Sequence, residues 1–300
     1  MSLTSVTGSA TSQKITPHTL LERKQARRPI TALTAYDYAT ARLADEAGID
    51  FLLVGDSLAM VVMGLESTLP VTVDEMLHHT RAVRRGVRRA MLVVDMPYGS
   101  YHVSIDHGVA NAARFVKEGG AEAVKIEGGR PELVERIIAA EIPVVGHIGL
   151  TPQSVHRMGG YKVQGKTAAQ YARLRKDARE LEIAGASAIV LEGMPRELAA
   201  EITAELDIPT IGIGAGIDCD GQILVFHDLV NLTFAPPARF VRRYGDAAEL
   251  FHNAISAYRD DVVERRYPSE SESYHLPRSV NGTAESAAVG FSTSHLRRKA

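Results

Sequence analysis

The chain has 300 residues, of which 45% are apolar and 23% are charged, so it can bury a large core and is not disordered as a whole. Lys and Arg number 34 against 36 for Asp and Glu, and the net charge of −2 excludes an electrostatic case for nucleic acid or an anionic membrane as the main partner. Cys219 is the only cysteine, which excludes an intramolecular disulfide framework and fits the reducing cytosol, so we expect a cytoplasmic protein.

The two ends of the chain differ from the rest in composition. Residues 1–14 lack the charged and apolar segments of a secretory signal, and we expect them to form a disordered arm. Residues 268–300 are rich in Ser, which predicts a largely disordered polar tail. The longest apolar stretch, 51–65, is too short to cross a bilayer, so no membrane span is predicted.

Between these ends, eight short apolar runs alternate with longer amphipathic segments, which is the pattern of βα units in a parallel sheet. Eight such units predict one closed (β/α)8 barrel, the TIM barrel fold. Helical patterns occupy 38–48, 73–87, 104–120 and 167–185. The expected strands are 29–36, 50–56, 90–97, 121–127, 142–149, 186–193, 208–216 and 223–229.

An open, doubly wound sheet is the alternative fold. When it binds a dinucleotide, such a sheet carries a G-x-G-x-x-G turn after its first strand, whereas the first turn here has no glycine. The glycine-rich loop at 212–216 follows the seventh strand, where it is either an anion-binding loop of a barrel or a tight turn. Only about six residues separate this loop from the eighth strand, too few for a helix, so the eighth unit is the weakest.

Charged residues within several of the predicted strands need an explanation, because the strands of a parallel barrel are buried on both faces. All of them lie at the carboxyl ends of their strands, the face where barrel enzymes place their catalytic groups. For any single carboxylate, a salt bridge or a helix cap is the simpler interpretation. Convergence from five strands favours an active site built from Asp56, Asp95, Lys125, Glu127, His147 and Glu192.

The acidic members of this set favour a hard cation. Asp56, Asp95 and Glu127 supply oxygen ligands without a nearby cysteine or paired histidines, which fits Mg²⁺ better than zinc. Some of these ligands could act through water. Lys125 and Glu127 are two residues apart on one strand, so both side chains can point into the barrel mouth, where they could also simply neutralise each other.

The remaining histidines and the arginine run carry less information. His78 and His79 lie in an apparent surface helix, and His102 and His107 do not have the four-residue spacing of a helical metal pair. We interpret these histidines as structural or solvated. The arginine-rich segment 81–89 is interpreted as a solvated helix face, with nucleic acid as the minor alternative.

Five segments of the chain resemble the ketopantoate hydroxymethyltransferase family. This resemblance covers residues 15–267, so the barrel domain is expected there, and it is specific because two of the segments are long and ungapped. The segments are TALTAYDYATARLADEAGIDFLLVGDSLAMVVMG, VVDMPYGSY, AVKIEGG, VVGHIGLTPQSVHRMGGYKVQGKT and IPTIGIGAG.

The resemblance implies a (β/α)8 barrel related to the phosphoenolpyruvate mutase and isocitrate lyase group. It implies transfer of a hydroxymethyl group from methylene-tetrahydrofolate to the 2-oxo acid 3-methyl-2-oxobutanoate, which gives ketopantoate for pantothenate and coenzyme A synthesis. It also implies a homo-oligomer, typically a decamer, and one Mg²⁺ per subunit.

The resemblance also assigns roles to residues. It implies that Asp56, Asp95 and Glu127 are metal ligands, and that Asp56 and Asp95 thereby also belong to the substrate-binding residues. A 2-oxo acid can chelate Mg²⁺ through its carboxylate and keto oxygens, and the metal then stabilises the enolate as a Lewis acid.

Four further residues receive roles in substrate binding and proton transfer. Ser57, Lys125 and His147 correspond to substrate contacts: Ser57 to the substrate carboxylate, Lys125 as a balancing cation and His147 as a hydrogen-bond donor. Glu192 corresponds to the general base that removes the C3 proton.

Three rival functions remain. A Schiff-base aldolase would use Lys125 as its nucleophile, but the adjacent Glu127 stabilises the ammonium form. A carbon–carbon lyase would use similar metal chemistry without folate. A non-catalytic scaffold barrel would be expected to lose one of the four acids, all of which are present.

Overall fold

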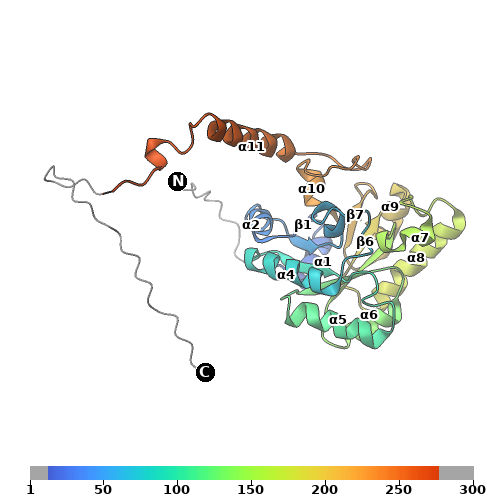
Figure 1. The fold of residues 1–300 in the computed structure, drawn as a ribbon. Coiled ribbons are helices and arrows are strands. Elements are labelled where there is room, and N and C mark those ends of the chain that lie inside the picture. Colours follow the sequence, from blue (N-terminus) through green and yellow to red (C-terminus); the bar gives the residue numbers. More distant parts are fainter. Residues whose placement is uncertain (1–12, 277–300) are drawn as a thin grey trace, which may run out of the picture. The chain divides into compact units, whose positions relative to one another are not determined.

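The computed structural model describes residues 13–276 (Figure 1). Most of the expected arm and most of the expected tail lie outside the described residues. The chain divides into two compact units, with the boundary between Ala248 and Glu249. The domain boundaries expected from the sequence, at 14/15 and 267/268, stay predictions.

The first unit contains a closed barrel of eight parallel strands, which confirms the predicted fold. The strands pair in chain order, and β8 pairs with β1 to close the barrel. The strands are β1 Ile30–Thr34, β2 Phe51–Val54, β3 Met91–Asp95, β4 Ala123–Glu127, β5 Val144–Gly149, β6 Ala188–Glu192, β7 Thr210–Ile213 and β8 Gly221–Leu224.

Helices follow the strands and lie outside them, as Figure 1 shows for α4, α5, α6 and α8. They form where the sequence shows amphipathic patterns, and several begin at a Ser, Thr or Asp cap; Thr72 and Glu75, for example, form a reciprocal capping box at the start of α4. The helices of this unit are α1 Pro17–Gln25, α2 Tyr38–Glu46, α3 Leu58–Val61, α4 Val73–Gly86, α5 Ile105–Lys117, α6 Pro131–Ile138, η1 Pro152–Ser154, α7 Val155–Met158, α8 Ala168–Ile183, α9 Arg196–Glu205 and α10 Phe226–Leu229.

The eighth unit differs from the sequence expectation. The strand predicted over 223–229 ends at Leu224, and the following residues form α10. The Phe226 N–H donates to Thr34 Oγ1 at 2.8 Å, so it bonds to a β1 side chain instead of continuing the strand ladder. No helix separates β7 from β8, in agreement with the short spacing. Gly214 and Gly216 in this connection have positive φ angles, as a tight turn requires.

Apolar residues alternate along each strand between the barrel interior and the helix layer. In β3, Met91 and Val93 belong to the interior cluster, whereas Leu92 and Val94 pack in the cluster that includes the helices. The two-residue repeat of a strand therefore fixes which side chains can reach the centre of the barrel. The same repeat brings Asp95 to the interior side at the end of β3.

Helix α1 covers the amino ends of the strands. Leu20 is completely buried and belongs to the interior cluster of the barrel. Arg23 donates to Asp50, which precedes β2, at 2.8 Å, and Lys24 contacts Asp220, which precedes β8, also at 2.8 Å. Arg89 reaches the other oxygen of Asp50 at 2.7 Å. Burial and these ion pairs close the barrel at the end opposite the acidic strand ends.

The second unit contains α11 (Ala247–Val263), which begins just before the unit boundary, and the short η2 (Glu270–Glu272). No residue of α11 is buried. Within residues 13–276, no helix combines the length and the apolar character that crossing a bilayer requires.

Leu20→Ala is expected to lower the free energy of unfolding by about 2–5 kcal/mol, because it opens a cavity in the barrel interior. Urea unfolding followed by circular dichroism measures this change. Leu43→Ala on α2, where the side chain is 63% exposed, is the control and should stay within about 0.5 kcal/mol of the wild type. Equal effects of the two substitutions would refute the role assigned to α1.

Candidate active site

One cavity of about 830 Å³ opens at the carboxyl ends of the strands. All the site residues expected from the sequence line it, although they come from four strands, β3 to β6, and the loop after β2. Its wall also includes apolar residues of the barrel interior, such as Leu53, Val190 and Ile223. The expected residues that it brings together are Asp56, Ser57, Asp95, Lys125, Glu127, His147 and Glu192.

Strand register explains why these residues meet. Asp95 of β3 is paired with Lys125 of β4, and Glu127 of β4 is paired with His147 of β5. Lys125 and Glu127 are two residues apart, so both side chains lie on the interior side of β4. Neighbouring strands thus place opposite charges next to one another.

Lys125 and Asp95 form a buried ion pair. The Lys125 Nζ lies 2.6 Å from Asp95 Oδ1, and both side chains are about 5% exposed. Burial acts to lower the pKa of Lys125, but the carboxylates of Asp95, Glu127 and Asp56 outweigh it and hold the pKa above its ordinary value. Lys125 is therefore a fixed ammonium ion.

The carboxylates of Asp56 and Asp95 are crowded by like charge. Burial, together with the charges of Asp95 and Glu127, raises the pKa of Asp56 well above its ordinary value. Burial also raises the pKa of Asp95, although the neighbouring Lys125 opposes this. The Asp56 backbone N–H donates to Asp95 Oδ2 at 3.1 Å. Lys125 and His147 face four carboxylates, those of Asp56, Asp95, Glu127 and Glu192, so this part of the cavity favours an added cation.

His147 lies between Glu192 on one side and Lys125 and Glu127 on the other. Its Nε2 lies 3.3 Å from Glu192 Oε2, while its Nδ1 lies 3.6 Å from Glu127 Oε1 and 3.2 Å from Lys125 Nζ. Burial and the charge of Lys125 lower the pKa of His147, but Glu127 and Glu192 outweigh both and raise it to about 9. Glu192 ends β6 and keeps 17% of its side chain exposed, so it can reach a ligand in the cavity.

Ser57 lies in the turn after β2 and is fixed by a residue that the sequence did not single out. Its Oγ is 2.8 Å from the hydroxyl of Tyr36, a side chain that is 1% exposed. A Cβ at Gly55 would lie 2.8 Å from Ser57 Oγ, so glycine leaves room for this hydroxyl. When Tyr36 donates this bond, the Ser57 proton stays available to a ligand.

The residues fit a magnesium ion by their chemistry, although they do not form a complete ligand set alone. Within residues 13–276, no group of three or more His, Cys, Asp or Glu side chains is arranged to hold a metal ion by itself. The buried donors are carboxylate oxygen atoms, the type of ligand that Mg²⁺ prefers. Mg²⁺ usually takes one or two protein carboxylates and completes its octahedron with water and substrate oxygens.

Sequence reasoning missed two polar residues beside the carboxylates. Gln153 of η1 donates to Asp56 Oδ2 at 2.8 Å, and Tyr101 donates to Gln153 at 2.6 Å. Both side chains are buried. Neither lies at the end of a predicted strand, and the only available signal was their position in loops that follow β5 and β3.

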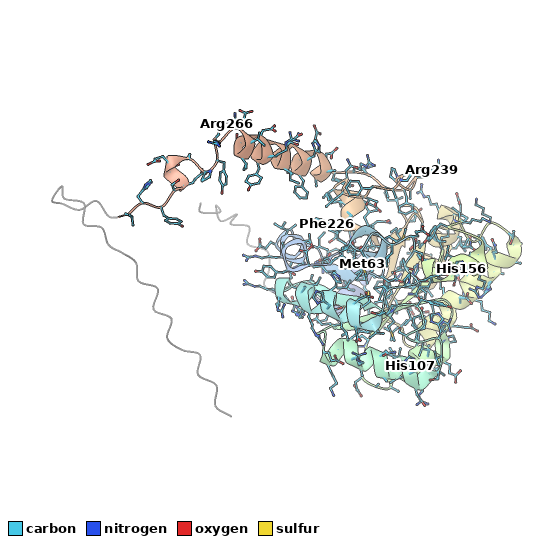
Figure 2. All side chains as sticks on the ribbon, viewed as in Figure 1. Met63, His107, His156, Phe226, Arg239 and Arg266 are labelled. Carbon is cyan, nitrogen blue, oxygen red and sulfur yellow. The ribbon has the colours of Figure 1, made fainter. Side chains whose placement is uncertain are left out.

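The histidines that the sequence analysis set aside, His78, His79, His102 and His107, do not line the cavity. His107 is exposed on the outer side of α5 (Figure 2), and His78 is exposed on α4. His79 contacts the backbone oxygen of Tyr36 at 2.7 Å. These positions agree with the structural or solvated role expected from the sequence.

Solved structures show which known proteins share the architecture of the barrel. A phosphoenolpyruvate phosphomutase from Streptomyces platensis subsp. rosaceus superposes with a TM-score of 0.55 at 14% identity, covering 86% of this chain and 92% of that one. A 2,3-dimethylmalate lyase, described as a PEP mutase/isocitrate lyase superfamily member, superposes with a TM-score of 0.52 at 16% identity, covering 92% and 93%. The barrel shares its fold with these two proteins.

Sequence comparison then gives the family. The ketopantoate hydroxymethyltransferase model matches residues 14–270. A 3-methyl-2-oxobutanoate hydroxymethyltransferase of Koribacter versatilis (strain Ellin345) is 68% identical over 91% of this chain and 93% of that protein. The protein of the same name from Thermoanaerobacter sp. (strain X514) is 52% identical over 90% of this chain and 99% of that protein. The chain belongs to the ketopantoate hydroxymethyltransferase family, a family of transferases, as its sequence motifs predicted.

Because Lys125 is held as an ammonium ion, we expect no Schiff base between Lys125 and a 2-oxo acid. Incubation with 3-methyl-2-oxobutanoate and sodium borohydride is expected to leave the intact mass unchanged, because a fixed ammonium ion cannot form a Schiff base. Mass spectrometry of the intact protein makes the measurement. A reduced adduct that disappears in Lys125→Arg would contradict the ion-pair assignment.

Proposed function

We propose that this chain transfers a hydroxymethyl group from methylene-tetrahydrofolate to 3-methyl-2-oxobutanoate and so forms ketopantoate for pantothenate synthesis. The observation that carries the proposal is that one cavity is lined by all seven of the predicted site residues. The names of the relatives state the same acceptor, 3-methyl-2-oxobutanoate.

The size and lining of the cavity support two co-substrates. Its volume of about 830 Å³ is within the range of pockets that hold drug-sized ligands, so it leaves room beyond a small 2-oxo acid. Leu53, Val190 and Ile223 offer an apolar wall that suits the branched aliphatic end of the acceptor. Phe234 and Phe240 add aromatic surface suited to a flat ring such as a pterin.

We propose Asp56, Asp95 and Glu127 as the residues that hold Mg²⁺, directly or through water, with one ion per chain. When bound, Mg²⁺ supplies Lewis-acid polarisation of the keto group, which makes the adjacent C3–H more acidic. A phosphonopyruvate hydrolase of the same fold was solved with oxalate and Mg²⁺, at a TM-score of 0.53 and 15% identity. The raised pKa of Asp56 supports the need for a cation beside these carboxylates.

The chain's own cations and hydroxyl orient the acceptor. Lys125, held by Asp95, balances the negative charge of a bound carboxylate without serving as a nucleophile. Ser57 donates its proton to the substrate carboxylate in the arrangement in which the Tyr36 hydroxyl donates to Ser57 Oγ. His147, flanked by Glu127 and Glu192, can turn an N–H toward a substrate oxygen.

Glu192 is proposed as the general base that takes the C3 proton. It stands at the end of β6, lines the cavity and is more exposed than the other carboxylates, so it can approach a carbon acid held at the cation. His147 contacts Glu192 Oε2 at 3.3 Å and limits the positions open to this carboxylate.

We also propose that the protein is a homo-oligomer, a decamer by family resemblance, and that it is cytoplasmic. Exposed apolar side chains on α11 support self-association. Phe251, Ile255, Tyr258 and Val262 repeat at helical spacing, and each is at least 43% exposed.

The direct test is an assay of acceptor consumption with and without methylene-tetrahydrofolate and EDTA. We expect turnover only when the folate is supplied, loss of turnover with EDTA, and recovery when Mg²⁺ is added in excess. Consumption without folate would support a carbon–carbon lyase instead. No consumption under any of these conditions would favour a non-catalytic barrel.

Glu192→Gln is expected to lower the rate of solvent deuterium exchange at C3 of the acceptor by at least about 100-fold, since a positioned base contributes roughly 10²–10⁴-fold. Proton NMR follows the exchange, and Mg²⁺ binding should persist in the variant. Glu197→Gln on the exposed first turn of α9 is the matched control. Exchange at the wild-type rate in Glu192→Gln would move the base to another residue.

A further inference from the structure

Gln153 contacts two of the three proposed metal ligands from a buried position. Its side-chain Nε2 donates to Asp56 Oδ2 at 2.8 Å and to the Met96 carbonyl at 3.0 Å. Its backbone N–H donates to Glu127 Oε2 at 3.0 Å. The side chain is 6% exposed, so these bonds do not compete with bulk water.

Tyr101 fixes the orientation of the Gln153 amide. The Glu127 N–H donates to the Tyr101 hydroxyl oxygen at 3.2 Å, which leaves the phenolic proton free to be donated to Gln153 Oε1 at 2.6 Å. Both amide hydrogens then face Asp56 and Met96. A flipped amide would set its oxygen against a carboxylate and a carbonyl oxygen, which is repulsive.

The Tyr101 ring is itself held in place by Arg130. The guanidinium lies 5.3 Å from the centre of the ring, and Arg130 Nε donates to the Glu127 carbonyl at 3.2 Å. Hydrogen bonds thus link the end of β4 to three segments: the loop after β3, the start of α6, and η1.

The hydrogen bonds from Gln153 engage one carboxylate oxygen of Asp56 and one of Glu127, and the second oxygen of each carboxylate does not contact Gln153. Gln153 holds Asp56 through Oδ2 and Glu127 through Oε2, so the oxygens turned away from Gln153 are Asp56 Oδ1 and Glu127 Oε1, the latter 3.6 Å from His147 Nδ1. The two carboxylates repel each other, and free rotation would separate them. Hydrogen bonds to such outer partners typically tune metal affinity by 10–100-fold.

We propose that Gln153, oriented by Tyr101, is a positioning residue that holds Asp56 and Glu127 together for cation binding. This inference rests on the proposed function, because it assumes that the two carboxylates bind a divalent ion. Gln153 acts through these carboxylates and is not assigned a contact with the substrate.

Mn²⁺ binding, followed by electron paramagnetic resonance, tests the proposal without relying on activity. Gln153→Leu keeps most of the side-chain volume and removes the amide, and it is expected to weaken Mn²⁺ binding by about 10–100-fold. Tyr101→Phe leaves the amide without its orienting donor, and it is expected to weaken binding by about tenfold. The matched controls are Gln170→Leu, at an exposed position of α8, and Tyr98→Phe, at a residue that is 50% exposed; both variants should bind Mn²⁺ like the wild type.

A second readout separates positioning from a general loss of structure. In both variants, the Mg²⁺ concentration for half-maximal rate should rise by the same factor as the Mn²⁺ dissociation constant, while kcat at saturating Mg²⁺ stays close to that of the wild type. Thermal unfolding checks that each variant is folded. If Gln153→Leu does not fold, Tyr101→Phe decides alone.

The outcomes are distinct. Wild-type Mn²⁺ affinity in a folded Gln153→Leu variant overturns the positioning role and leaves the proposed function intact, and the same result in Tyr101→Phe does so where Gln153→Leu does not fold. Failure of the wild-type protein to bind Mn²⁺ overturns the metal site of the proposed function, and the positioning role with it.

Discussion

Three carboxylates, Asp56, Asp95 and Glu127, are buried at the carboxyl end of the barrel, where Lys125 pairs with Asp95 and His147 lies beside Glu127. Burial makes each negative charge costly, and proximity adds repulsion, which together raise the pKa values of both aspartates. Such a cluster is stable only when cations and hydrogen-bond donors surround it. The ion pair to Lys125 and the bonds from Gln153 partly meet this need, and a divalent ion would meet the rest.

The register of neighbouring strands and the two-residue repeat of side chains along each strand bring these carboxylates close together. Along β3, β4 and β5, every second side chain points into the barrel interior. The inward-pointing residues near the centre are apolar, and those at the carboxyl ends of the strands are charged. The opposite end is closed by α1, where Leu20 is buried and Arg23 and Lys24 form ion pairs. Stability is thus concentrated at the amino end of the strands, while the carboxyl end carries groups that are costly to bury and suited to chemistry.

The strands and the charged strand ends could be predicted because both follow from local patterns. The apolar runs predict the strands of the barrel. A charged residue at the end of such a run is predicted to lie at the open end of the barrel. Gln153 and Tyr101 could not be found this way, since their hydrogen bonds join residues far apart in the sequence; Gln153 and Asp56 have a sequence separation of 97. The end of β8 was misjudged for a similar reason, because Thr34 of β1 takes the Phe226 N–H that a longer strand would have used. Tyr36 was not predicted either, because its hydroxyl forms a hydrogen bond with Ser57, a residue 21 positions away in the sequence.

The need of the acidic cluster for a cation is the central claim, and calorimetric unfolding with Mg²⁺ tests it most directly. With 3-methyl-2-oxobutanoate present and folate absent, the midpoint of thermal unfolding should rise with Mg²⁺ concentration, because a ligand that binds only the folded state stabilises it by RT ln(1 + [L]/Kd). Asp95→Asn should reduce this rise. A midpoint that stays constant up to millimolar Mg²⁺ in the wild-type protein would contradict the account.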